Sequence, residues 1–165
     1  MLSWVYYYLS LNPICRSKMI EEHNNVFGQD TDPVNVATKI SSDPKLLAKL
    51  ECTTAVMKEA LRLRPIGDGV RVSPPGYIIR MGTGAEFDTT DTILDIQHNE
   101  LHTKQEIWGT TAAAFDPERF MSGRNIPSAY MPFSKRPRDC IGQNLAYLEG
   151  YPEILYANYD RERLH

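Results

Sequence analysis

Apolar and polar positions alternate with the period of an α-helix through the first part of the chain. Residues 2–11 are mostly apolar or aromatic and are predicted to form the end of a core helix. The alternative, a membrane anchor or signal, needs about 20 apolar residues, more than this stretch offers. Asn12-Pro13 then combines an N-cap with a proline at the first helical position, and Gly28 is typical of a helix end. A second helix is therefore predicted between them.

The strongest helical pattern begins at Asp43-Pro44, which repeats the cap-and-proline signal. Apolar residues recur from there at helical spacing until Pro65 ends the pattern. The polar stretch 29–42 before it is expected to hold a short helical segment. Residues 1–64 are thus predicted to be helical.

The pattern then changes to short runs rich in β-branched residues. Residues 70–73 and 77–80 are predicted to be strands, joined by a hairpin turn at the sequence PPG of residues 74–76. Residues 92–96 are a further candidate strand. We therefore expect 65–108 to be a β-rich region.

The last part of the chain is irregular before it becomes helical again. Residues 109–140 hold four prolines and few periodic apolar positions, which is long for a simple connection. A final helix is predicted from residue 141, with Pro152 breaking or kinking it, so that 141–165 forms a last helix and tail. The predicted fold class is mixed α/β and mainly helical, with a small antiparallel β region and an irregular meander.

Composition is consistent with one domain. The chain has 165 residues, of which 42% are hydrophobic and 10% aromatic, enough for one core. Its 18 basic and 21 acidic residues give a net charge of -3, which argues against a nucleic-acid partner, DNA included. Its three cysteines are widely spaced, so the sequence contains neither a disulfide framework nor a CxxC metal motif.

Glu59 and Arg62 are three residues apart on the predicted helix and can form an ion pair on one of its faces. Such pairs are usually exposed and contribute less than ~1 kcal/mol. A surface pair is therefore the default interpretation from the residues alone.

Cys140 stands just before the last predicted helix, two residues after Arg138. The helix dipole and a nearby cation favour the thiolate, which can ligate a soft metal or haem iron. The alternative is a buried structural thiol.

His98 and His102 are four residues apart, which is also a spacing found in zinc sites. The sequence has no HExxH motif, and surface histidines are the favoured interpretation. It also has no glycine-rich phosphate loop and no GxSxG elbow, so nucleotide binding and serine hydrolysis have no support.

Three motifs occur in a fixed order: EALR at residues 59–62, DPERF at 116–120 and FSKRPRDCIG at 133–142. Together they resemble the C-terminal part of the cytochrome P-450 family. Residues 12–28 also resemble the helix that precedes the family's Glu-x-x-Arg helix, and residues 53–65 resemble that helix itself. Residues 105–109 together with 115–120 resemble the family's meander. The resemblance covers nearly the whole chain.

This resemblance implies a haem b cofactor whose iron takes Cys140 as its axial thiolate ligand. It implies that Arg138 binds a haem propionate and that Phe133 packs near the haem. The resemblance also implies that Arg71 is a second propionate partner. The alternative is that Arg71 is an exposed charge on a strand.

The resemblance further implies a buried charge network of Glu59, Arg62 and Arg119. This network would hold the meander and the cysteine loop against the helix, so its role is structural. Removing one member would leave an uncompensated buried charge, at a cost of ~3 to 5 kcal/mol.

By resemblance, the function is haem-thiolate monooxygenation of a small apolar substrate, with electrons from a reductase. Two departures favour an alternative. Arg136 stands where the family has glycine, at a cost of roughly 1 to 2 kcal/mol, and the family's central helix with its proton-delivering pair has no counterpart. The alternative is a haem-free, truncated remnant reused as a binding module or as a redox-independent catalyst of the cyclase or isomerase type.

Location and partners are expectations of the same kind. Relatives of this type are usually held at the endoplasmic reticulum membrane by an anchor, and without one we expect a cytoplasmic protein. Apolar surface that the rest of such a fold would cover is expected to be exposed, where a partner chain could cover it.

Overall fold

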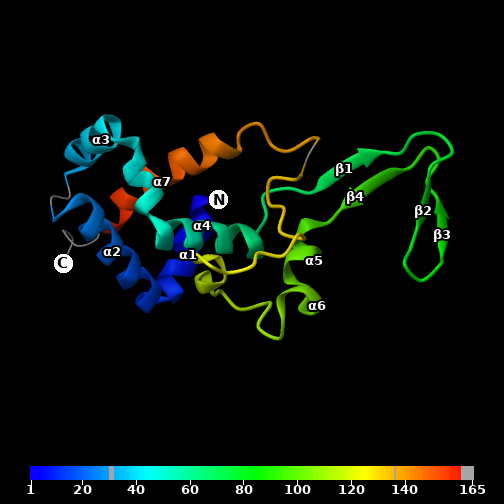
Figure 1. Ribbon diagram of the computed structural model, residues 1–165, viewed down its shortest axis with the longest axis horizontal. Helices are drawn as coiled ribbons and strands as arrows, with labels where there is room; N and C mark the ends of the chain where they lie inside the picture. Colours follow the sequence, from blue (N-terminus) through cyan, green and yellow to red (C-terminus); the bar gives the residue numbers. More distant parts are fainter. Residues whose placement is uncertain (30–31, 136, 161–165) are drawn as a thin grey trace.

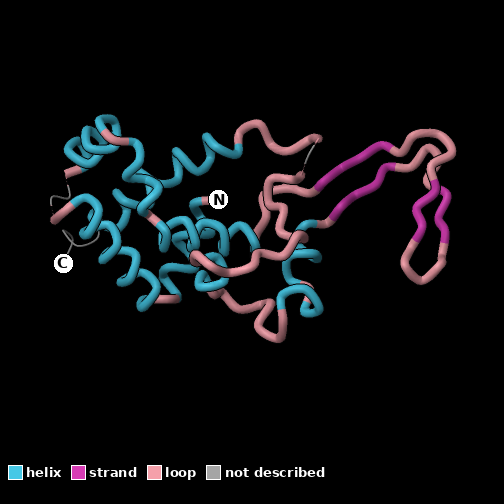
Figure 2. Tube along the Cα trace, in the orientation of Figure 1, coloured by secondary structure: helices cyan, strands magenta, loops and turns pink. Residues whose placement is uncertain are grey.

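A computed structural model describes residues 1–29, 32–135 and 137–160 of the chain, and the side chains of 33 and 157–160 are not described. Its helices gather into one body, and its four strands project from one end of that body (Figures 1 and 2). The mixed and mainly helical fold is confirmed. Arg136, where the sequence predicts backbone strain, lies outside the described residues.

The first two helices begin and end close to the predicted signals, and the third is the short helical segment expected within residues 29–42. Helix α1 spans Leu2–Leu11, α2 spans Pro13–Phe27 and α3 spans Pro33–Ser42. Gly28 ends α2 with a φ of 82°, a backbone conformation in which glycine pays no Cβ penalty. Within the described residues, no helix combines the length and apolarity needed to cross a membrane.

The helix predicted to run from Asp43 to Pro65 is in fact two elements. Asp43 caps a 3₁₀ helix, η1 (Pro44–Lys49), by accepting a hydrogen bond from the Lys45 N–H. Helix α4 (Glu51–Leu63) starts only after Leu50. Leu50 is fully buried and has a non-helical φ and ψ of -86° and 65°. The chain turns at Leu50 while the side chain of this residue packs into the core. The apolar spacing did not predict this turn.

The strands pair differently from the predicted hairpin. β1 (Gly69–Val72) pairs antiparallel with β4 (Ile93–Ile96), and β2 (Ile78–Arg80) pairs antiparallel with β3 (Glu86–Asp88). The predicted turn exists, since the Tyr77 N–H donates to the Pro74 carbonyl, but its two flanking strands do not pair. The first strand pairs with β4 instead, and this pairing continues at Ser73, whose N–H donates to the Thr92 carbonyl.

The end of the region expected to be β-rich is helical. Helices α5 (His98–Thr103) and α6 (Gln105–Trp108) follow β4 directly. The meander then contains the 3₁₀ helix η2 (Pro117–Phe120), which packs against α4.

Helix α7 (Gln143–Asp160) continues through Pro152, so the predicted break does not occur. Two side chains beyond the proline, Ile154 and Leu155, are fully buried. Tyr151 also hydrogen-bonds Thr54 on α4 at 2.8 Å between the two hydroxyl oxygens. Packing on both sides of Pro152 therefore keeps the helix in one piece.

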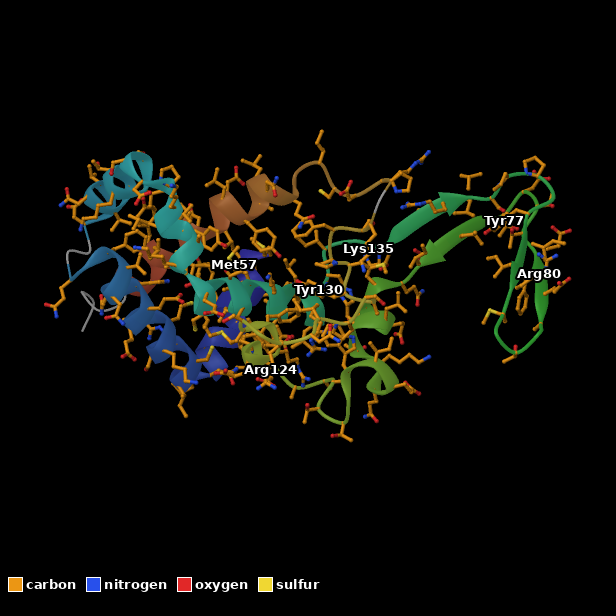
Figure 3. The ribbon with its side chains drawn as sticks, viewed as in Figure 1. Met57, Tyr77, Arg80, Arg124, Tyr130 and Lys135 are labelled. Atoms are coloured by element: carbon orange, nitrogen blue, oxygen red, sulfur yellow. The ribbon has the colours of Figure 1, made fainter. Side chains whose placement is uncertain are left out.

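The main core lies among α1, α2, α4 and α7. Its buried members are Val5, Tyr8, Leu9, Met19, Val56, Met57, Ala60, Leu63 and Ile154. Figure 3 shows Met57 and Tyr130 within the helical body, whereas Tyr77 and Arg80 lie in the projecting β region. The core thus places α4, which carries Glu59 and Arg62, at the centre of the molecule.

Candidate functional site

The last two turns of α4 present a buried ion pair. Glu59 and Arg62 are both 0% exposed. Arg62 donates from Nε to Glu59 Oε2 at 2.7 Å and from Nη2 to Oε1 at 2.8 Å. The pair is therefore two-pronged and shielded from water, unlike the surface pair favoured by spacing alone.

The remaining donors of Arg62 bind the backbone of distant segments. They reach the carbonyl oxygens of His102, Ala112 and Ala114 at 2.6, 2.6 and 3.0 Å. Glu59 Oε1 in turn accepts the Asp116 N–H at 2.8 Å. One ion pair thus fixes α5 and residues 112–116 of the meander onto α4.

Arg119 lies at the edge of this pair. Its Nε is 3.7 Å from Glu59 Oε1 and makes no hydrogen bond to any described residue. Its Nη atoms donate to the Trp108 carbonyl and to the carbonyl and hydroxyl of Thr111. The structure therefore brings the three predicted network residues together, with Arg119 bound mainly to meander backbone.

Burial raises the pKa of the Glu59 carboxyl, and the hydrogen bonds from Arg62 oppose this shift. The five donors of the guanidinium leave Arg62 well satisfied despite its burial. All donors of this buried pair are used by protein groups, so the pair is not free to contact a substrate. Its role is to hold the surrounding segments in place.

His102 connects the ion pair to the cysteine loop. Its Nε2 accepts the Met131 N–H at 2.9 Å, so Nδ1 carries the proton and donates to the Arg62 carbonyl. Burial lowers the pKa of His102 to about 4, so the ring stays neutral. The prediction of a surface histidine is wrong here, because helix α5 turns this residue into the core.

His98 is also buried, at 2% exposure, and its ring stacks on His102 with centroids 6.0 Å apart. Both nitrogens of His102 are already bonded to backbone groups. In the part of the chain that the structure describes, no three His, Cys, Asp or Glu side chains are grouped to hold a metal ion.

Cys140 lies on a short loop closed by its own backbone. The Cys140 N–H donates to the Phe133 carbonyl at 2.8 Å, and Ser134 adopts a φ of 62° inside this loop. The Cys140 side chain is exposed, so it is not the buried structural thiol considered from the sequence.

The Cys140 cavity is a hollow of about 410 Å³ between this loop, the start of α7 and the segment before β1. Its described lining includes Ile66, Gly67, Asp68, His98, Pro132, Phe133, Ser134, Arg138, Cys140, Gly142 and Ala146. The Phe133 ring also packs on Tyr147, with centroids 5.6 Å apart. Three of the predicted haem-site residues, Phe133, Arg138 and Cys140, thus share one cavity.

Arg71 is not among the described residues of that lining. Its Nη1 donates to the carbonyl of the neighbouring Val70 at 2.7 Å. His98, by contrast, forms part of the wall. The sequence singled it out only for its zinc-like spacing from His102, and nothing in the local pattern placed it in this cavity.

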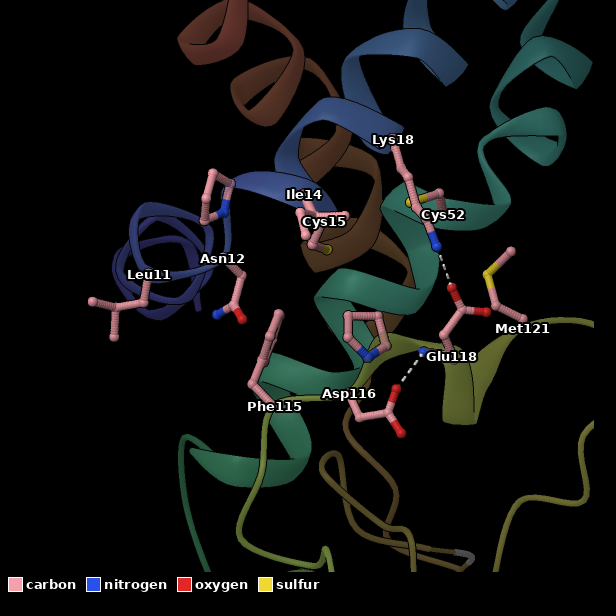
Figure 4. A pocket seen from close by; sticks show the side chains of 12 residues that line it. Leu11, Asn12, Ile14, Cys15, Lys18, Cys52, Phe115, Asp116, Glu118 and Met121 are labelled. Carbon is pink, nitrogen blue, oxygen red and sulfur yellow. Dashed lines mark hydrogen bonds and ion pairs between the residues drawn. The ribbon is translucent and has the colours of Figure 1, made fainter.

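A second cavity, of about 540 Å³, lies between α2, α4 and η2 (Figure 4). An ion pair between Lys18 and Glu118, 2.9 Å apart, spans it. Burial raises the pKa of Cys15 and raises that of Cys52 to about 12. These thiols stay protonated and serve as apolar wall groups rather than nucleophiles.

The family profile described as Cytochrome P450 matches residues 1–150. The chain belongs to the cytochrome P450 family. The resemblance of the three motifs is thereby confirmed.

Curated relatives of this cytochrome P450 chain include three fungal proteins. Cytochrome P450 monooxygenase ptmG of Penicillium ochrochloron is 33% identical over 151 residues, which cover 90% of this chain and 27% of the relative. Cytochrome P450 monooxygenase PC-23 of Penicillium crustosum is 37% identical over 133 residues, covering 78% and 63%. Cytochrome P450 monooxygenase acrF of Aspergillus aculeatus is 30% identical over 169 residues, covering 90% and 34%. The chain spans between about a quarter and two thirds of the length of these relatives.

Cytochrome P450 proteins use haem, and the donor set of the Cys140 cavity fits that group in kind. The exposed sulfur of Cys140 is a soft ligand suited to iron. The guanidinium of Arg138 matches a carboxylate, and Ile66 and Phe133 supply apolar wall. The residues present are therefore compatible with haem b.

Proposed function

We propose that the Cys140 cavity holds haem b and that the protein is a haem-thiolate monooxygenase. The carrying observation is that an exposed cysteine, an arginine and apolar walls from distant segments meet in one cavity. When bound, a haem with a thiolate ligand supplies oxygen activation, because the thiolate favours O–O cleavage. A small apolar substrate and an electron-donating reductase belong to the same proposal.

Four residues have roles in this proposal. Cys140 would supply the thiolate ligand of the iron, and Arg138 would bind a carboxylate of the haem. Phe133, held by Tyr147, excludes water from the sulfur side of the cavity. Arg71 is kept as a second carboxylate partner on the ground of family likeness alone.

The buried ion pair supports the cavity through a chain of hydrogen bonds. The Arg62 carbonyl accepts from His102, and His102 accepts the Met131 N–H. The Met131 carbonyl accepts the N–H of Ser134, and the adjacent Phe133 carbonyl accepts the N–H of Cys140. This continuous path from α4 to the ligand loop supports a positioning role for Glu59, Arg62 and Arg119.

The test is spectroscopic. Protein expressed with ample haem is purified, reduced and exposed to carbon monoxide. We expect haem to co-purify and the Soret band to shift as it does for a thiolate ligand. Cys140→Ser should lose the thiolate signature, whereas Cys15→Ser, which removes a thiol from the other cavity, should keep it.

Two results would contradict the proposal. Protein without haem absorbance would favour the haem-free alternative, a binding module or redox-independent catalyst. An unchanged spectrum in Cys140→Ser would exclude Cys140 as the ligand.

A further inference from the structure

The Cys15 cavity is the hollow of about 540 Å³ between α2, α4 and η2 (Figure 4). Pockets that hold small molecules have volumes of roughly 300 to 1,000 Å³ and mostly apolar walls. The described lining of this cavity is also mostly apolar: Leu11, Pro13, Ile14, Cys15, Cys52, Phe115, Pro117 and Met121. It shares no described residue with the Cys140 cavity, so the proposed haem function gives this hollow no role.

The charged side chains in the described part of this wall already face opposite charges. Lys18 Nζ lies 2.9 Å from Glu118 Oε1, and this pair spans the cavity. Asp116 Oδ1 accepts the Glu118 N–H at 3.2 Å, and Asp116 Oδ2 lies 3.8 Å from Arg119 Nε. A charged ligand would lose water without gaining a free partner, which is costly. The wall therefore favours a neutral ligand.

Sulfur atoms enter the wall from three segments. Cys15 lies on α2, Cys52 on α4 and Met121 directly after η2, and all three side chains line the cavity (Figure 4). Burial raises the pKa of both thiols, so they add no charge. Sulfur is polarizable and makes favourable contacts with the edges of aromatic rings. Such a wall distinguishes an aromatic ligand from an aliphatic one.

Phe115 adds an aromatic surface to the same wall. Its ring stacks on Tyr8, with the ring centroids 4.7 Å apart and an interplanar angle of 4°. This contact holds the Phe115 ring in one orientation beside the cavity. Aromatic rings attract each other in offset-stacked and edge-to-face arrangements. A ring in the cavity thus gains more from this wall than a saturated molecule of the same size.

We propose that the Cys15 cavity is a binding site for a small, neutral, aromatic molecule. The site is separate from the Cys140 cavity and needs no haem. It therefore goes beyond the proposed function and can be tested independently of it.

The experiment compares 2-naphthol with decahydro-2-naphthol, which has the same ring skeleton and hydroxyl group but no aromatic ring. Both molecules are neutral at neutral pH. Binding to the full chain, without added haem, is measured by equilibrium dialysis. We expect 2-naphthol to bind more tightly. Met121→Leu keeps the apolar volume but removes a sulfur, so it should weaken 2-naphthol binding by about threefold and leave the saturated probe unchanged.

A matched pair of variants locates the bound probe. Cys15→Phe fills the Cys15 cavity, whereas Ala146→Phe places the same ring in the wall of the Cys140 cavity. We expect Cys15→Phe to weaken 2-naphthol binding by at least tenfold and Ala146→Phe to leave it unchanged. Circular dichroism checks that each variant is folded. Met121→Leu carries the test if the larger side chain of Cys15→Phe prevents folding.

Three results would overturn the inference: no binding of 2-naphthol, equal affinities for the two probes, or a 2-naphthol affinity that Met121→Leu leaves unchanged. Loss of binding in Ala146→Phe but not in Cys15→Phe would place the probe in the Cys140 cavity and would overturn it as well. None of these results bears on ligation of haem by Cys140. Failure of the chain to bind haem would likewise leave this inference intact.

Discussion

At the scale of single residues, burial decides what Glu59 and Arg62 do. Exposed, they would be a weak surface pair, but the structure gives both 0% exposure and five hydrogen bonds from one guanidinium. Removing two charges from water costs free energy of desolvation. The attraction between the charges offsets this cost only if every donor and acceptor of the pair is hydrogen-bonded. The pair is thus sensitive to the loss of either member.

Glu59→Gln should destabilise the protein by about 3 kcal/mol or more, because it leaves the Arg62 charge buried without a counter-ion. The free energy of unfolding is measured by urea titration. Glu118→Gln is the matched control, since Glu118 forms an exposed pair with Lys18, and it should leave stability almost unchanged. Equal effects of the two substitutions would show that the Glu59–Arg62 pair is not a structural anchor.

At the scale of elements, tertiary packing in α7 overrides the low helix propensity of Pro152. Pro152 cannot donate to the Leu148 carbonyl, and its ring crowds the preceding turn. The helix nevertheless reaches Asp160, because Ile154 and Leu155 are buried beyond the proline. Tertiary contacts therefore carry a helix whose local sequence opposes it.

Pro152→Ala should stabilise the protein by about 1 to 2 kcal/mol, because alanine restores the missing hydrogen bond and removes the crowding. Urea unfolding and the helical signal in circular dichroism are the measurements. Glu149→Ala, an exposed position on the same helix, controls for helix propensity and should change little. A fall in stability in Pro152→Ala would mean that ring packing outweighs the strain.

At the scale of the whole molecule, a compact helical body carries an extended pair of two-stranded sheets (Figure 1). Val72 and Ile93 face each other in register on β1 and β4 and are 77% and 69% exposed. Ile141 and Leu145 are also exposed around the start of α7. Apolar surface of this kind usually meets another surface, and the curated relatives have more chain with which to cover it. A partner that covers these faces remains a proposal.

Stability of the whole chain should fall as pH drops from 6.5 towards 4. Burial lowers the pKa of both His23 and His102 to about 4, whereas an unfolded histidine titrates near 6.5. Between pH 6.5 and 4 these histidines bind protons in the unfolded chain but not in the folded chain. Lowering the pH therefore favours unfolding. Each histidine contributes up to about 3 kcal/mol to the change.

The measurement is urea unfolding across this pH range in wild type and His102→Gln. Glutamine does not titrate, so the variant should show a flatter pH profile, and the difference between the two isolates His102. Parallel profiles would show that His102 has the same pKa in the folded and unfolded chains, and would contradict the prediction.

Local rules predicted much of the fold. Asn12-Pro13 and Gly28 bound a helix as expected, because caps and backbone preferences act within a few residues. The three motifs likewise identified the family before any contact was known. Pairing of the strands was not predictable in this way, since either neighbour of the PPG turn could have found its partner farther along the chain.

The residue types of the candidate site were also predictable from the sequence, whereas their spatial arrangement was not. Residue types and their spacing specify which chemistry is present: a cysteine before a helix, an arginine beside it, and a Glu-x-x-Arg pair. The folded chain adds that Glu59 and Arg62 are buried, that Arg71 lies outside the described lining of the Cys140 cavity and that His98 lies inside it. The physical reason is that burial and cavity walls arise from segments far apart in the chain, and no local pattern records which of them meet.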